Sequence, residues 1–246
     1  MSDVAFPEQQ AWPSAPASPV PRAPEGLLKA VVALLGLVAL ADLFAVYADL
    51  NLANLIGDDA NFVATPVGDL EAAENLYGFA ATLWFTPYIA CVVVFLVWFF
   101  RMRKYIGALA QDAFERGAGW AIGSWFIPIG ALWMPVRIAL QMWNAATRTW
   151  SAEPARYPSA WPVRLWWSLF ILTTLAGRFT SGRYNAAESL TEIRAAVLQT
   201  AVSDGLDILA AGAAAYFAIR LTALHRRPAP EPGYSALVQP GFPAAP

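Results

Sequence analysis

The sequence predicts an all-α fold: a polytopic membrane helix bundle with four transmembrane helices and a Pro/Trp-rich re-entrant or interfacial helical pair. Of the 246 residues, 58% are hydrophobic and 14% are charged, whereas soluble domains have roughly 45–50% apolar and about 25% charged residues. The apolar residues gather in long runs, and no run shows the alternation of a barrel strand. Because a chain in hydrocarbon must satisfy its own backbone groups, we expect each run to be helical.

The composition excludes several classes of function. The single cysteine, Cys91, excludes a disulfide framework and a thiolate zinc cluster, and the single histidine, His225, removes most histidine-based catalytic and metal sites. The 16 Lys and Arg residues nearly balance the 18 Asp and Glu residues, which leaves no basic face for nucleic acid. We therefore expect no enzyme activity, no cofactor, no metal site and no nucleic-acid partner.

The two ends of the chain are rich in proline. Residues 1–25 and residues 226–246 contain six prolines each and carry too little contiguous apolar surface to fold, so both are predicted to be disordered cytoplasmic tails. The first apolar run is longer than the roughly 7–15 residues of a signal peptide, and we expect it to be retained as an anchor. The membrane domain is expected over residues 26–225.

Four apolar runs predict membrane-spanning helices. A helix rises about 1.5 Å per residue, so about 20 apolar residues cross a hydrocarbon core of about 30 Å. The predicted spans are residues 27–47, 76–100, 162–180 and 200–221.

A fifth run, residues 117–143, differs from the others because it contains Pro128 and Pro135. Each proline removes a helix donor, so two short helices joined at residues 127–130 are expected. Tryptophan suits the level of the lipid headgroups, which favours a re-entrant or interfacial position. The tryptophans of this run are Trp120, Trp125, Trp133 and Trp143. A kinked fifth span is the alternative.

The distribution of Lys and Arg predicts the orientation. If residues 117–143 do not cross the membrane and the N-terminus is cytoplasmic, thirteen basic residues lie inside and three lie outside. If this run does cross, the division becomes nine to seven. In the first of these two arrangements, the first outer loop, Asp49 to Glu74, has six acidic residues and no basic one. We therefore predict a multi-pass protein of the cell membrane with both termini cytoplasmic.

Charged residues inside predicted spans are the first candidates for function, because each costs about 2.5–3.5 kcal/mol to insert. Four of them are expected at similar depth near the outer membrane face: Asp42, Arg178, Asp204 and Asp207. They predict either a polar cluster that holds an ion, a proton or a small polar ligand, or a structural pair of Arg178 with an aspartate at the interface. No Gly-x-Gly-Asp motif precedes the aspartates, which argues against an intramembrane aspartyl protease.

A second candidate surface combines the tryptophans and prolines of the fifth run with nearby basic residues. Basic residues at the inner face attract anionic lipids, by about 1 kcal/mol each. This lipid or partner surface is predicted to contain Trp120, Trp125, Pro128, Trp133, Pro135, Arg101, Arg103 and Lys104. Small residues at 119–123 and 210–215 would let helices approach closely, either within the bundle or in a homo-oligomer.

The same part of the chain carries a family resemblance. The strings FLVWFFR at residues 95–101, GWAIGSWFIP at 119–128 and LWMP at 132–135 resemble actinobacterial membrane proteins grouped as domain of unknown function 4328. The paired tryptophans at 166–167 and the segment 220–224 are also similar, so the resemblance spans roughly residues 30–225. It implies a polytopic bacterial membrane protein and implies no activity.

The sequence thus favours a non-enzymatic membrane scaffold that binds a lipid or a membrane-protein partner. The alternative is a small permease or channel component that uses the Asp/Arg cluster.

Overall fold

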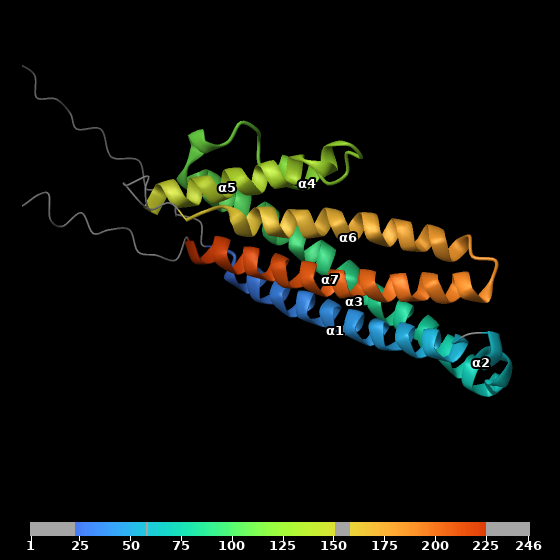
Figure 1. The fold of residues 1–246 in the computed structure, drawn as a ribbon. Helices are drawn as coiled ribbons and strands as arrows, with labels where there is room; N and C mark the ends of the chain where they lie inside the picture. The colour runs from blue at the N-terminus through green and yellow to red at the C-terminus, as the bar shows by residue number, and fades with distance from the viewer. Residues whose placement is uncertain (1–22, 58, 151–157, 225–246) are drawn as a thin grey trace, which may run out of the picture.

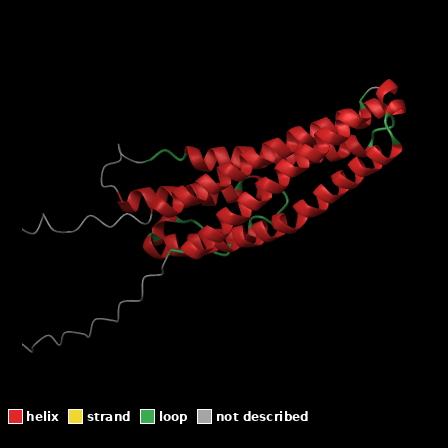
Figure 2. Cartoon of the chain, turned by 90° about the horizontal axis from the view of Figure 1, so that it is seen from below, coloured by secondary structure: helices red, strands yellow, loops and turns green. Residues whose placement is uncertain are grey.

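The computed structural model describes residues 23–57, 59–150 and 158–224, and all the regular elements in these ranges are helices (Figure 2). The four long helices are α1 (Glu25–Ile56), α3 (Val67–Leu109), α6 (Trp161–Asn185) and α7 (Leu190–Leu224). The short elements are α2 (Asp59–Ala64), η1 (Gln111–Ala113), α4 (Trp120–Gly123), η2 (Gly130–Leu132) and α5 (Met134–Trp150). Both predicted tails lie outside the described residues, apart from residues 23–25.

Helices α1, α3 and α7 are long and apolar enough to cross a membrane, with mean hydropathies of 2.4, 2.2 and 1.4 over their most apolar stretches. They indicate a protein embedded in the membrane. The 25 residues of α6 fall outside this group, since tryptophan, threonine and arginine side chains lower its hydropathy. Each of the four predicted spans lies within one long helix, and each helix extends beyond the predicted span at both ends.

Local signals set several helix ends. Helix α1 stops at Gly57, whose φ of 53° suits glycine and whose N–H bonds the carbonyl of Ala53. A proline stands in the first turn of α6, where its missing N–H costs nothing. Helix α7 begins with a capping box, in which Ser189 and Glu192 each accept a hydrogen bond from the other's backbone N–H.

The long helices pack in the order α3–α1–α7–α6, so α3 and α6 are the outer members of the row. Helices α4 and α5 form a hairpin that packs against both α3 and α6. The start of α1 and the end of α7 lie at one end of the molecule, named the terminal end, and α2 lies at the opposite end, named the loop end (Figure 1). The hairpin leaves the terminal end, turns part-way along the bundle and returns to the terminal end (Figure 1).

An aromatic core joins the hairpin to the bundle. Trp166 of α6 stacks on Phe217 of α7 with ring centroids 4.6 Å apart. The Trp125 ring meets Phe170 at 5.6 Å and Trp167 at 5.9 Å, both edge to face. The same ring lies 6.3 Å from each of two phenylalanines of α3, Phe95 and Phe99. Such pairs add about 0.5–1.5 kcal/mol each beyond their buried area.

Two tryptophans of the hairpin pack inside the protein, whereas the sequence predicts that they face the lipid headgroups. Trp125 belongs to the aromatic core, and Trp143 is buried and donates its indole N–H to the Pro158 carbonyl at 3.1 Å. Trp120 and Trp133 keep exposed faces. Trp143 is buried because α5 lies lengthwise against α6 and α7, and the face of α5 that carries it packs against these helices.

Candidate functional site

Four aspartates from two antiparallel helices line one cavity of about 390 Å³. Asp42 and Asp49 are seven residues apart on α1, which places them on one face two turns apart. Asp204 and Asp207 are one turn apart on α7. Because α1 and α7 pack side by side over much of their length, these two faces meet. We call this space the acidic cavity.

The aspartates meet as two pairs, one residue from each helix. The carboxyl groups of Asp49 and Asp204 lie within hydrogen-bonding reach of each other. Asp42 faces Asp207 and lies within reach of the Trp84 side chain, while Thr173 of α6 lies within reach of Asp207. Two carboxyl groups as close as those of Asp49 and Asp204 cannot both carry a charge cheaply, so this pair favours a shared proton or a bound cation.

Burial makes these acids unusual. Asp42 is 1% exposed and Asp49 is 2% exposed, and one carboxyl oxygen of each has no hydrogen-bond partner. A buried polar atom without a partner costs free energy, which proteins rarely accept outside functional sites. Two such atoms line the same cavity.

Asp42 and Asp207 lie further from the helix ends than the predicted spans place them. Asp42 lies near the middle of α1, Asp207 is the midpoint of α7 and Thr173 is the midpoint of α6. The helix ends lie further from these residues than the ends of the predicted spans, because α1 continues to Ile56 and α7 already begins at Leu190. The expected depth near the outer membrane face stays a prediction. Hydropathy alone does not separate the polar residues at these helix ends from loop residues.

The structural pair of Arg178 with an aspartate is not formed. Over the ranges that the structure describes, the one ion pair joins Arg137 to Glu115. Arg178 is exposed and lines a neighbouring space of about 560 Å³, which shares Asp42, Trp84 and Asp207 with the acidic cavity. Arg178 thus shares a space with Asp42 and Asp207 and forms no ion pair with them.

Three residues of this site are not among those predicted from the sequence. Asp49 was expected in the first outer loop and is a buried residue of α1. Tyr77 and Trp84 of α3 line the cavity beside the aspartates. Spacing was the available signal, since Asp42 and Asp49, like Tyr77 and Trp84, are seven residues apart and share a helix face.

The predicted lipid or partner surface is divided by the fold. Arg101, Lys104, Trp120, Pro128 and Trp133 are exposed. In contrast, the other three members are wholly or partly buried: Arg103, Trp125 and Pro135. The surface is therefore narrower than predicted.

A family described as a domain of unknown function, DUF4328, matches residues 63–223. The chain belongs to this family. The DUF4328 match contains α3, the α4–α5 hairpin, α6 and Asp204 and Asp207 of α7, whereas α1 with Asp42 and Asp49 precedes it. No curated protein and no solved structure matches the chain.

Proposed function

We propose that this DUF4328 protein is a non-enzymatic, small cation permease or channel component, and that protons or monovalent cations pass through the acidic cavity. The observation that carries the proposal is the pair of buried, unpartnered carboxyl oxygens of Asp42 and Asp49 in a cavity half-way along the bundle. Intramembrane acids that face a cavity mark ion and proton pathways.

The spacing of the four aspartates favours small monovalent cations and protons. Within the described part of the chain, no three Asp, Glu, His or Cys side chains converge closely enough to hold a metal ion. The two aspartate pairs instead follow one another along the cavity, about 10 Å apart on α1. Hydroxyl groups of Thr180, Ser181 and Ser203 line the same space and can pass a proton between the pairs.

We propose that α1, α3, α6 and α7 all cross the membrane of a bacterial cell, with the terminal end cytoplasmic. The common end of α1 and α7 and the excess of basic residues there support this topology (Figure 1). The hairpin would enter and leave by the cytoplasmic face. Apolar side chains exposed around its turn support contact with lipid: Phe126, Ile127, Ile129, Leu132 and Trp133.

In this topology the hairpin closes one half of the pathway. It packs between α3 and α6 towards the terminal end, and its Trp125 contacts Trp166 and Phe170, which also line the space beside the acidic cavity. The aromatic core thus lines that neighbouring space, which shares Asp42 and Asp207 with the acidic cavity, and we take it as the floor of the neighbouring space. A cation entering from the outer side would reach the aspartates before this floor.

Proton flux into liposomes tests the proposal. The full chain is reconstituted with a pH-sensitive dye inside, and a potassium gradient with valinomycin drives proton entry. We expect flux above that of empty liposomes, and we expect Asp49→Asn and Asp207→Asn each to reduce it to background. Asp69→Asn, an exposed acid in the first turn of α3, is the matched control and should behave as the wild type.

The same assay with external sodium and a sodium-sensitive dye inside the liposomes separates the two cations. Background flux for the wild type with both ions, or equal flux in the two cavity variants and the control, would contradict the proposal.

The scaffold function remains a second candidate. It is favoured by the exposed rings of Trp120 and Trp133 beside the basic residues of the terminal end. A membrane-protein partner or a second copy of the chain would be bound there. Replacing Trp133 alone tests it, because Trp125 belongs to the core: loss of a co-purifying protein would support a scaffold, and an unchanged complex would count against it.

A further inference from the structure

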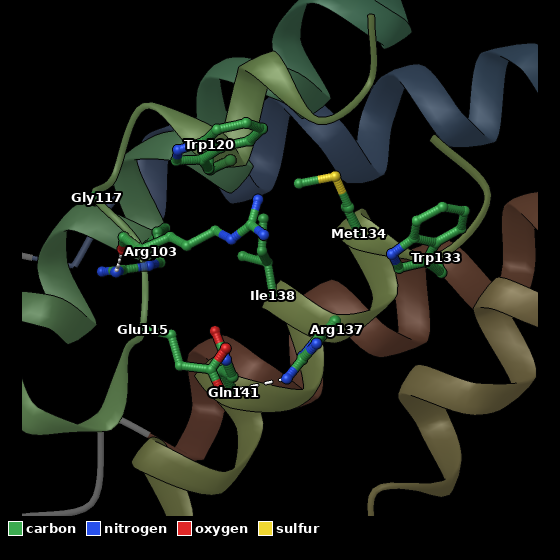
Figure 3. Close-up of a pocket in the computed structure, with 11 residues that line it drawn as sticks. Arg103, Glu115, Gly117, Trp120, Trp133, Met134, Arg137, Ile138 and Gln141 are labelled. Carbon is green, nitrogen blue, oxygen red and sulfur yellow. Dashed lines mark hydrogen bonds and ion pairs between the residues drawn. The ribbon is translucent and has the colours of Figure 1, made fainter. Parts of the chain in front are cut away.

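A separate pocket lies beside the hairpin, between the end of α3 and the start of α5 (Figure 3). Three arginines line it: Arg103, Arg116 and Arg137. Trp120 and Trp133 stand on opposite sides of it (Figure 3). Glu115 is the one acidic residue of the lining, so the lining carries a net charge of +2. We call this space the basic pocket.

Arg103 is built into the wall of the pocket. Its side chain is nearly buried, its Nη2 donates to the Arg116 carbonyl at 2.7 Å, and its guanidinium carbon lies 3.3 Å from the centre of the Phe114 ring. Gly107 leaves the room that the guanidinium occupies, since a Cβ there would overlap Nη1. The fold therefore holds this cation in one place.

Within the described ranges, no carboxylate forms an ion pair with Arg103. Among the residues described, the acid nearest to the pocket, Glu115, pairs with Arg137 instead, at 3.2 Å. Arg116 lies over the Trp120 ring at 4.7 Å and has no acidic partner in the described ranges. A buried charge without a counter-ion is strongly unfavourable. An anion bound in the pocket would supply that counter-ion and stabilise the protein.

We propose that the basic pocket binds the phosphate of an anionic phospholipid headgroup. The guanidinium group has the planar, forked geometry that recognises phosphate oxygens. Exposed apolar side chains continue from the pocket along the hairpin turn, namely Trp133, Leu132 and Ile129, and they offer a surface for acyl chains. A free phosphate ion would leave that surface unused. The proposal goes beyond cation conduction and does not depend on it.

Lipid-dependent thermal unfolding tests this proposal. The full chain is placed in nanodiscs of phosphatidylcholine, with or without phosphatidylglycerol, and Tm is measured. We expect phosphatidylglycerol to raise the Tm of the wild type and to raise that of Arg116→Gln and Arg103→Gln much less. Arg148→Gln, which removes an exposed arginine of α5 outside the pocket, should respond as the wild type does.

The Tm values in nanodiscs of phosphatidylcholine alone give an independent test. There Arg103→Gln should be at least as stable as the wild type, because it removes an uncompensated charge. If it does not fold, Arg116→Gln at the exposed rim still decides the question. An equal response of Arg116→Gln and Arg148→Gln, or no wild-type response to phosphatidylglycerol, would overturn the proposal. An equal rise in Tm when inorganic phosphate is added to phosphatidylcholine nanodiscs would assign the pocket to free phosphate and would overturn the proposal of a lipid headgroup.

Discussion

Gly107 and Arg103 show how one residue can fix the position of a charge. In a helix, replacing glycine by alanine usually adds about 0.5–1 kcal/mol of stability. At Gly107 the new methyl group would meet the Arg103 guanidinium, whose flexible end can move away. We therefore expect Gly107→Ala to fold without the usual gain in Tm and to lose the response to phosphatidylglycerol.

Gly78→Ala is the matched control for this prediction, since Gly78 lies in the same helix with open space around it. Its Tm should rise and its lipid response should persist. Both variants are compared by thermal unfolding in the two nanodisc compositions. A wild-type lipid response in Gly107→Ala would show that the position of Arg103 does not matter.

At this scale the sequence predicted three of the four cavity aspartates and misassigned their surroundings. Asp42, Asp204 and Asp207 were selected because they interrupt apolar runs, and they do line one cavity. Asp49 was missed because it follows the end of such a run, where hydropathy no longer separates a helix from a loop. Arg178 was placed correctly on α6, but side-chain direction, which sequence does not encode, turns it to the surface.

Among the elements, the first half of the α4–α5 hairpin packs on the bundle through the Trp125 ring. Trp125 contacts aromatic rings of both α3 and α6, whereas its neighbour Phe126 is 72% exposed. Removing a large aromatic side chain from a packed core costs about 3–5 kcal/mol of unfolding free energy. We expect Trp125→Ala to lower Tm strongly and Phe126→Ala to change it little, because surface substitutions stay within about 0.5 kcal/mol.

Thermal unfolding of the two variants in phosphatidylcholine nanodiscs measures this difference. Similar Tm values would mean that the hairpin is not held by the aromatic core.

The prolines of the hairpin were correctly identified as interruptions, and their separate roles follow from geometry. Pro128 is exposed in the turn between α4 and η2, and Pro135 occupies the first turn of α5, where no donor is lost. The helical path is interrupted near residues 127–130 as expected, but α4 is a single turn and α5 continues to Trp150, so the pair of short helices stays a prediction. The burial of Trp143 could not be predicted, because it depends on which face of α5 meets α6 and α7.

For the whole molecule, composition was sufficient to predict an all-helical membrane chain, but the packing order was not accessible. Apolar runs look alike on all faces, so they do not reveal that α3 and α6 are the outer members of the row. That order leaves room for both the acidic cavity and the basic pocket. The hairpin fills the gap between α3 and α6 towards the terminal end, and the acidic cavity lies in the part of the bundle that it leaves open.

The proposed topology makes a prediction for opposite ends of the molecule. Single cysteines are introduced at Asn144 of α5 and at Ala186 after α6, both exposed, in a Cys91→Ala background. If α6 crosses the membrane and the hairpin does not, a membrane-impermeant maleimide labels Ala186→Cys in intact cells and labels Asn144→Cys only after permeabilisation. The reverse pattern would make the hairpin a fifth span. It would also place α2 and the α6–α7 connection on different sides of the membrane, although the structure has them at the same end (Figure 1).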